Sequence, residues 1–189
     1  DMEEDWIFNF FDKCRLTSDE EMQELWARLL SSEANEPGSY SKRTVNMVAS
    51  MDKRDAEIFR DLCCFTVRYG KGIVVPVVFN FDDEIYRESG VSTTGLAHLD
   101  DVGLVQLERF GEFARTWKSR RGHVEYFGTR IRLKLPLYSE TLPIGKADFS
   151  RVGKELFEVC NPSPKEGFLD YLRQEWKSKG IAVEVDESS

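Results

Sequence analysis

Apolar residues recur at helical spacing through the first third of the chain. Residues 3–14 form one amphipathic stretch. Ser18, three positions before Glu21, is expected to form a capping box that opens a longer helix to about residue 34. The proline at position 37 cannot continue that helix, and the glycine after it permits a turn. The pattern therefore predicts two successive helices that end in a tight joint.

This joint carries a Pro-Gly turn, a serine cluster and neighbouring cations. Ser39 or Ser41 is expected to cap a third helix that extends to about residue 49, with Lys42 and Arg43 in its first turn. A phosphate site at a helix start usually has a glycine-lined loop and a nearby cation, but the Gly-x-x-x-x-Gly-Lys-Ser/Thr spacing is absent here. We therefore predict a capped helix–turn–helix joint in which Lys42 and Arg43 are exposed to solvent.

After Gly70 the pattern changes from helical spacing to β-branched runs and alternation. The run IVVPVVF predicts a short buried strand, which Pro76 confines to a sheet edge because proline cannot donate a backbone hydrogen bond. Residues 122–137 alternate apolar and cationic side chains around Gly128, which is typical of a β-hairpin. A last helix over residues 168–179 and a terminal strand, IAVEV, complete the pattern.

The order of elements in the middle of the chain resembles a winged helix. Helices are predicted over residues 52–68, 82–88 and 92–103, ahead of a hairpin region at 104–136. The predicted fold class is α+β, with a helical N-terminal part followed by a winged-helix-like unit with a β-hairpin and C-terminal helices. Packed as one compact domain, the expected segments are an N-terminal helical segment (1–50), a winged-helix-like αβ unit (51–145) and a C-terminal helix-strand extension (146–189).

Charge is distributed unevenly along the chain, whose net charge is −8. Residues 1–36 contain eleven acidic and three basic side chains, a balance of −8, whereas residues 109–134 contain eight basic and two acidic ones, a balance of +6. This asymmetry is the most suggestive functional feature of the sequence.

The basic segment has two interpretations. Its cations could form a charged sheet face that meets the acidic N-terminal helices of the same or another chain, or they could neutralise phosphates while Trp117 stacks on a base. The sequence pI of about 5.0 favours the first, because nucleic-acid-binding domains tend to exceed roughly 9. The candidate binding residues for either reading are Arg115, Trp117, Lys118, Arg120, Arg121, Arg130, Arg132 and Lys134.

Trp6 and Phe10 share one face of the first helix. Such a stripe is typical of a helix–helix contact, but part of it could face a partner, so both residues are partner-face candidates. We expect a protein partner or self-association, with nucleic acid as the other possibility.

Signals for catalysis, metals and cofactors are weak. The four cysteines show no CxxC spacing, the chain has two histidines, and no nucleophile motif accompanies His98. We expect no enzyme activity, no metal and no cofactor, with reduced cysteines in a cytoplasmic protein. No apolar run reaches the roughly 18 residues of a membrane span, and the acidic opening DMEEDW is unlike a secretory signal.

The phrase LWARLLSSEANEPGSYSKR, residues 25–43, together with the later YFGTRIRLKLP and DFSRVGKEL, resembles the bacterial family called domain of unknown function 2806. The resemblance covers most of the chain. It implies no catalytic residue, because the family has no established activity, but it does imply a role in phage conflict and a longer full protein. We therefore expect a non-enzymatic interaction or regulatory domain with a possible place in phage defence. The alternative is a nucleic-acid-binding winged-helix domain that uses the basic hairpin at 109–134.

Overall fold

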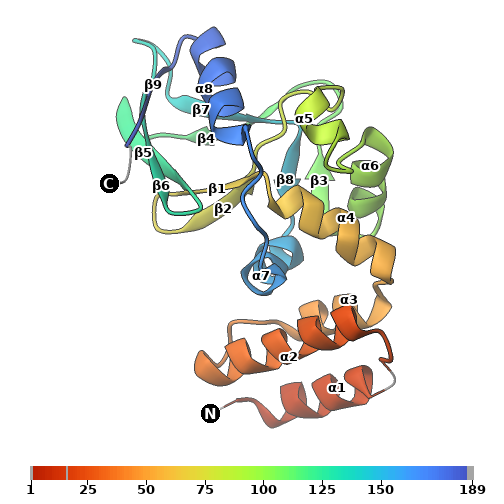
Figure 1. The fold of residues 1–189 in the computed structure, drawn as a ribbon. Helices are drawn as coiled ribbons and strands as arrows, with labels where there is room; N and C mark the ends of the chain where they lie inside the picture. Colours follow the sequence, from red (N-terminus) through yellow and green to blue (C-terminus); the bar gives the residue numbers. More distant parts are fainter. Residues whose placement is uncertain (1, 16, 187–189) are drawn as a thin grey trace.

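The computed structural model of the protein describes residues 2–15 and 17–186. Three N-terminal helices form a layer at the bottom of Figure 1, and a body that contains the other helices and the described strands lies above them. The helices are α1 (Glu4–Cys14), α2 (Glu20–Asn35), α3 (Lys42–Ser50), α4 (Lys53–Cys63), α5 (Glu84–Arg87), α6 (Thr93–Asp101), α7 (Arg151–Cys160) and α8 (Phe168–Ser178). The strands are β1 (Thr66–Tyr69), β2 (Ile73–Pro76), β3 (Val105–Leu107), β4 (Phe113–Thr116), β5 (Arg121–Tyr126), β6 (Thr129–Lys134), β7 (Thr141–Gly145), β8 (Ala147–Phe149) and β9 (Ala182–Val185).

Side-chain caps fix the starts of several helices. Ser41 caps α3 and Asp52 caps α4, both as the sequence predicts, and Asp55 completes a capping box with Asp52. The predicted box at Ser18 is wrong. The cap of α2 is Asp19, whose carboxylate accepts the backbone N–H of Met22 at 3.1 Å, so the helix begins one residue later than expected.

The main sheet has five antiparallel strands in the order β2-β1-β5-β6-β9. Strand β2 lies at an edge, as Pro76 predicts. Helix α8 packs on one face, where Phe168 contacts Tyr126 with ring centroids 5.2 Å apart. Helix α7 lies on the other face by β1 and β2 (Figure 1). There the Arg68 guanidinium lies over the Phe157 ring. Within residues 2–15 and 17–186, the β5–β6–β9 part of that second face is left open.

The α+β class is confirmed, but the winged-helix detail is not. The hairpin β5–β6 turns at Phe127 and Gly128, which both have positive φ, yet its strands lie inside the five-stranded sheet instead of projecting as a wing. The predicted helix over residues 52–68 is also too long, since α4 ends at Cys63. Thr66 and the residues after it pair with β2, because this β-branched and aromatic run finds a strand partner in the following segment.

The predicted hairpin region 104–136 contains four strands, and two of them, β3 and β4, pair outside the region. Strand β3 pairs with β8 and β4 pairs with β7, so each forms a two-stranded ribbon with a segment distant in sequence.

One hydrophobic core cluster extends from Trp6 in α1 to Val183 in β9. Within the described residues, no helix combines the length and apolar character needed to cross a membrane.

Candidate interaction surfaces

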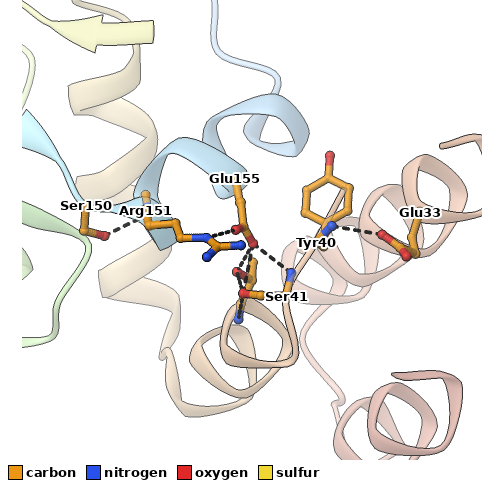
Figure 2. A network of polar contacts seen from close by, with 8 residues as sticks. Glu33, Tyr40, Ser41, Ser150, Arg151 and Glu155 are labelled. Carbon is orange, nitrogen blue, oxygen red and sulfur yellow. Dashed lines mark hydrogen bonds and ion pairs between the residues drawn. The ribbon is translucent and has the colours of Figure 1, made fainter. Parts of the chain in front are cut away.

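The start of α3 is closed by a carboxylate from α7. Glu155 accepts the backbone N–H of Ser41 at 2.8 Å and the hydroxyls of Ser41 and Thr44 (Figure 2). Partial burial alone would raise the pKa of Glu155, but these hydrogen bonds, together with one from Arg151, lower it below its ordinary value. The carboxylate thus occupies the position that a phosphate would take at a helix N-terminus.

A second carboxylate holds the loop that precedes α3. Glu33 is only 2% exposed, and its oxygens accept the backbone N–H group of Gly38 at 2.6 Å. They also accept that of Tyr40 at 2.9 Å (Figure 2). Lys42 and Arg43 point to solvent, as predicted, and Lys42 pairs with Asp5 at 3.2 Å. The joint is therefore a structural one, with its backbone donors bound by the protein itself.

Four of the predicted basic residues lie together on the uncovered part of the main sheet. We call this surface the open charged face, and it consists of Arg121, His123, Glu125, Arg130, Arg132, Lys134, Glu184 and Asp186. An ion-paired arginine, Arg68, marks its border, because the Arg68 guanidinium donates to both carboxylate oxygens of Glu158 on α7 at 3.0 and 2.8 Å. Beyond this border the side chains face solvent.

Carboxylates lie among the cations of the open charged face. Arg132 donates to Asp186 at 2.7 Å, and this contact raises the pKa of the arginine. Arg130 lies opposite Glu125 in the strand register, while Arg121 lies opposite another cation, Lys134. The face is therefore mixed in charge, with one directly opposed cation pair.

The other predicted candidates do not join this face. Arg115 forms an ion pair with the buried carboxylate of Asp148, so it is part of the packing between β4 and β8. Trp117 is half-buried over Gly122, Arg120 donates to a backbone carbonyl at 3.3 Å, and Lys118 is exposed in the β4–β5 connection. The eight candidates therefore separate into four that lie on the open charged face and four that lie elsewhere, of which Arg115 has a structural role.

The acidic N-terminal helices do not cover the basic residues of the same chain. Their carboxylates pair locally or with α3 and α4, for example Asp5 with Lys42 and Glu21 with Lys53 at 3.8 Å. Among the described residues, no ion pair joins positions 1–36 to positions 109–134. The expectation of pairing within one chain is therefore wrong, because α1 and α2 lie at the far end of the molecule from the open charged face (Figure 1).

The assignment of Trp6 and Phe10 to a partner face is also wrong. Each is 2% exposed; their rings stack with centroids 5.2 Å apart, and Phe10 meets Trp26 edge-on at 5.1 Å. Helix α1 instead exposes Phe8 at 73% and Phe11 at 54%. Because aromatic residues lie on both sides of this short helix, the sequence pattern did not indicate which side is buried. It therefore did not identify Phe8 and Phe11 as the exposed residues.

A family model described as "Protein of unknown function (DUF2806)" matches residues 1–173. The chain belongs to this family. Comparison with curated proteins gives no match, and comparison with solved structures gives none either. The family description assigns no activity, so the roles of individual residues rest on the geometry above.

His98 of this family member forms a structural contact. His98 contacts Asp55, the residue that completes the α4 capping box, at 2.5 Å, which ties α6 to α4. All four cysteines are free thiols, and Cys63 is fully buried. Within residues 2–15 and 17–186, no group of three or more His, Cys, Asp or Glu side chains is arranged to hold a metal ion.

Proposed function

We propose that this protein is a non-enzymatic interaction domain that binds a protein partner through the open charged face. The observation that carries the proposal is the alternation of Arg130, Arg132 and Lys134 with Glu125, Glu184 and Asp186 on one uncovered surface. A protein surface can present both signs of charge in a matching pattern, which gives specificity and orientation to an encounter. A phosphate backbone cannot, since it carries negative charge throughout.

Carboxylates within the open charged face also reduce the number of cations that are available to bind phosphates. Arg132 is bound to Asp186, and Arg130 has Glu125 opposite it, so Arg121 and Lys134 are the two cations of the face without a directly opposed carboxylate. Two phosphate contacts predict a slope of only about −2 for the logarithm of affinity against that of salt on duplex DNA. Nucleic-acid binding is still the second candidate, because like charges directly opposite each other on a sheet are unfavourable and an anion would relieve them.

Site-specific crosslinking tests the proposal. A photo-crosslinking amino acid in place of Lys134 should trap a partner protein, or a second copy of the chain, in bacterial lysate. The same group in place of Arg54, which is exposed on α4, should not trap that species. The Arg121→Glu variant should abolish the crosslink at position 134, since it reverses a charge on the face.

Fluorescence anisotropy with a labelled DNA duplex completes the test. We expect weak binding at low salt that disappears at physiological salt. Submicromolar duplex binding that persists at physiological salt, and that Arg121→Glu abolishes but Arg54→Glu does not, would contradict the proposal and support the second candidate.

A bacterial role in phage defence is part of the same proposal and is supported by the family resemblance alone. Efficiency of plating on cells that express the wild-type protein or the Arg121→Glu variant tests it. We expect phage protection that requires the open charged face, so equal plating on both strains and on cells without the protein would contradict this role.

A further inference from the structure

An open notch lies at the end of the main sheet, between the β1–β2 turn and the β4–β5 connection. Strand β1 ends at Tyr69, which pairs with Val124, whereas β5 begins three residues earlier at Arg121, so β5 extends beyond the end of β1. The notch beside this extension has a volume of about 540 Å³. That is within the roughly 300–1,000 Å³ typical of sites for small ligands.

Flat apolar side chains form part of the notch. The rings of Tyr69 and Trp117 are nearly parallel, with an interplanar angle of 28° and centroids 6.3 Å apart. Ile73 adds an apolar side chain that is 44% exposed. Because the two rings already pack against each other, a planar ligand would not enter between them. It would stack instead on the ring surface that faces solvent.

The position of Trp117 is fixed by a glycine beneath it. A Cβ atom on Gly122 would lie 2.2 Å from the indole ring, so the ring rests directly on the backbone of β5. The backbone N–H of Trp117 also donates to the carbonyl of Glu140 at 2.7 Å. This aromatic surface is therefore held in place before any ligand arrives, which reduces the entropy lost on binding.

The polar groups of the notch favour an anion. Lys71 stands at the tip of the β1–β2 turn and Lys118 follows Trp117; both are exposed, and His123 also borders the notch. None of its lining residues is acidic. The notch thus differs from the open charged face, where carboxylates alternate with the cations.

We propose that this notch binds a nucleotide unit, with its base against Trp117 and Tyr69 and its phosphate beside Lys71 and Lys118. Bases stack on aromatic side chains irrespective of their sequence, and lysine binds phosphate as a point charge. The unit can come from a free mononucleotide or from a single strand, whereas a base paired within a duplex cannot reach the rings. The residues assigned here to the base and the phosphate are not part of the open charged face, so either proposal can fail without the other.

The protein contains its own reporter for this site. Trp117 is half-buried, whereas Trp6, Trp26 and Trp176 are at most 4% exposed. A base that stacks on Trp117 should therefore quench a separable part of the tryptophan emission. Titration with AMP and with a short oligodeoxyadenylate, followed by fluorescence and by calorimetry, should give saturable binding with one site per chain.

Fragments and variants test the two halves of the proposed ligand. Adenosine and ribose 5-phosphate should each bind at least about tenfold more weakly than AMP, because each lacks one of the two contacts. Lys71→Glu should weaken binding of AMP and of the oligonucleotide by about tenfold or more. Arg54→Glu, an equal charge change at an exposed site on α4, should leave both within about twofold. Trp117→Leu should abolish the quenching, and calorimetry on the Lys71→Glu variant decides the matter if the leucine variant does not fold.

The relative affinities of the two probes identify the source of the nucleotide. An oligonucleotide that binds more than about tenfold tighter than AMP indicates a single-strand site, and AMP binding of equal or greater strength indicates a free nucleotide. The proposal is overturned if neither probe saturates the protein, if Lys71→Glu has no more effect than Arg54→Glu, or if an acidic peptide with one phenylalanine binds more tightly than both probes.

Discussion

The carboxylate of Glu155 on α7 accepts the backbone N–H of Ser41 at 2.8 Å, and so caps a helix more than a hundred residues away in sequence (Figure 2). This contact joins the N-terminal helical layer to the body that contains the strands. It also explains why the serine-rich joint has no vacant anion site, because the protein supplies the anion itself.

Replacement of Glu155 by glutamine should destabilise the fold by about 1–3 kcal/mol, since hydrogen bonds to a charged group are lost. Urea melts measure this difference, and Glu166→Gln, at an exposed position, is the matched control. An equal effect from the control would contradict the role assigned to Glu155.

The same contact should make stability depend on pH. The pKa of Glu155 is lower in the folded protein than its ordinary value of 4.5, so its contribution is fully present above that value. It is lost as the pH falls through the lower folded-state pKa. The stability difference between wild type and Glu155→Gln should therefore shrink in acid, and a difference that stays constant from neutral pH to strong acid would contradict the pKa direction.

Lys42 and Arg43 should contribute little to stability. Replacing both with alanine removes exposed cations and one exposed ion pair, so the free energy of unfolding should change by no more than about 0.5 kcal/mol. A chemical melt that shows a clearly larger loss would reveal a buried partner for one of them.

The two faces of α1 should respond differently to truncation. Phe10→Ala removes a buried ring that contacts Trp6 and Trp26, and should cost about 3–5 kcal/mol. Phe8→Ala alters an exposed ring and should change stability by no more than about 0.5 kcal/mol. Thermal or urea unfolding of both variants checks the assignment, which fails if the order is reversed.

Gly122 should not tolerate a side chain. Gly122→Ala places a methyl group against the Trp117 ring and should destabilise the protein by about 1–3 kcal/mol through overpacking. Tryptophan emission should shift to longer wavelength as the ring moves into solvent. Gly111→Ala, where the new methyl group meets only ordinary contacts, serves as the control and should leave the emission unchanged.

Cys63 should be the slowest of the four thiols to react. Burial raises its pKa well above the ordinary value, and its side chain is fully enclosed, so alkylation requires unfolding. Cys14, which is partly exposed, should react in the native state. Timed alkylation read by peptide mass spectrometry measures both rates, and equal rates in the folded protein would contradict the burial of Cys63.

Sequence alone was sufficient for features that depend on neighbouring residues. Ser41 and Asp52 cap their helices, Pro76 lies at a sheet edge, and the hairpin turns at Gly128 as predicted. Each of these follows from backbone geometry and hydrogen bonds within a few positions, which the local residue types largely dictate.

Contacts between distant segments were decided only by the tertiary structure. The strand β4 pairs with β7, the strand β1 replaces the end of a predicted helix, and Arg115 meets Asp148 instead of solvent. Likewise, the packing of α1 against α2 buries Phe10 and leaves Phe8 exposed, although both are apolar. The physical reason is that side-chain burial and strand pairing depend on which surfaces meet in space, and a charge or an aromatic ring in the sequence does not specify its partner.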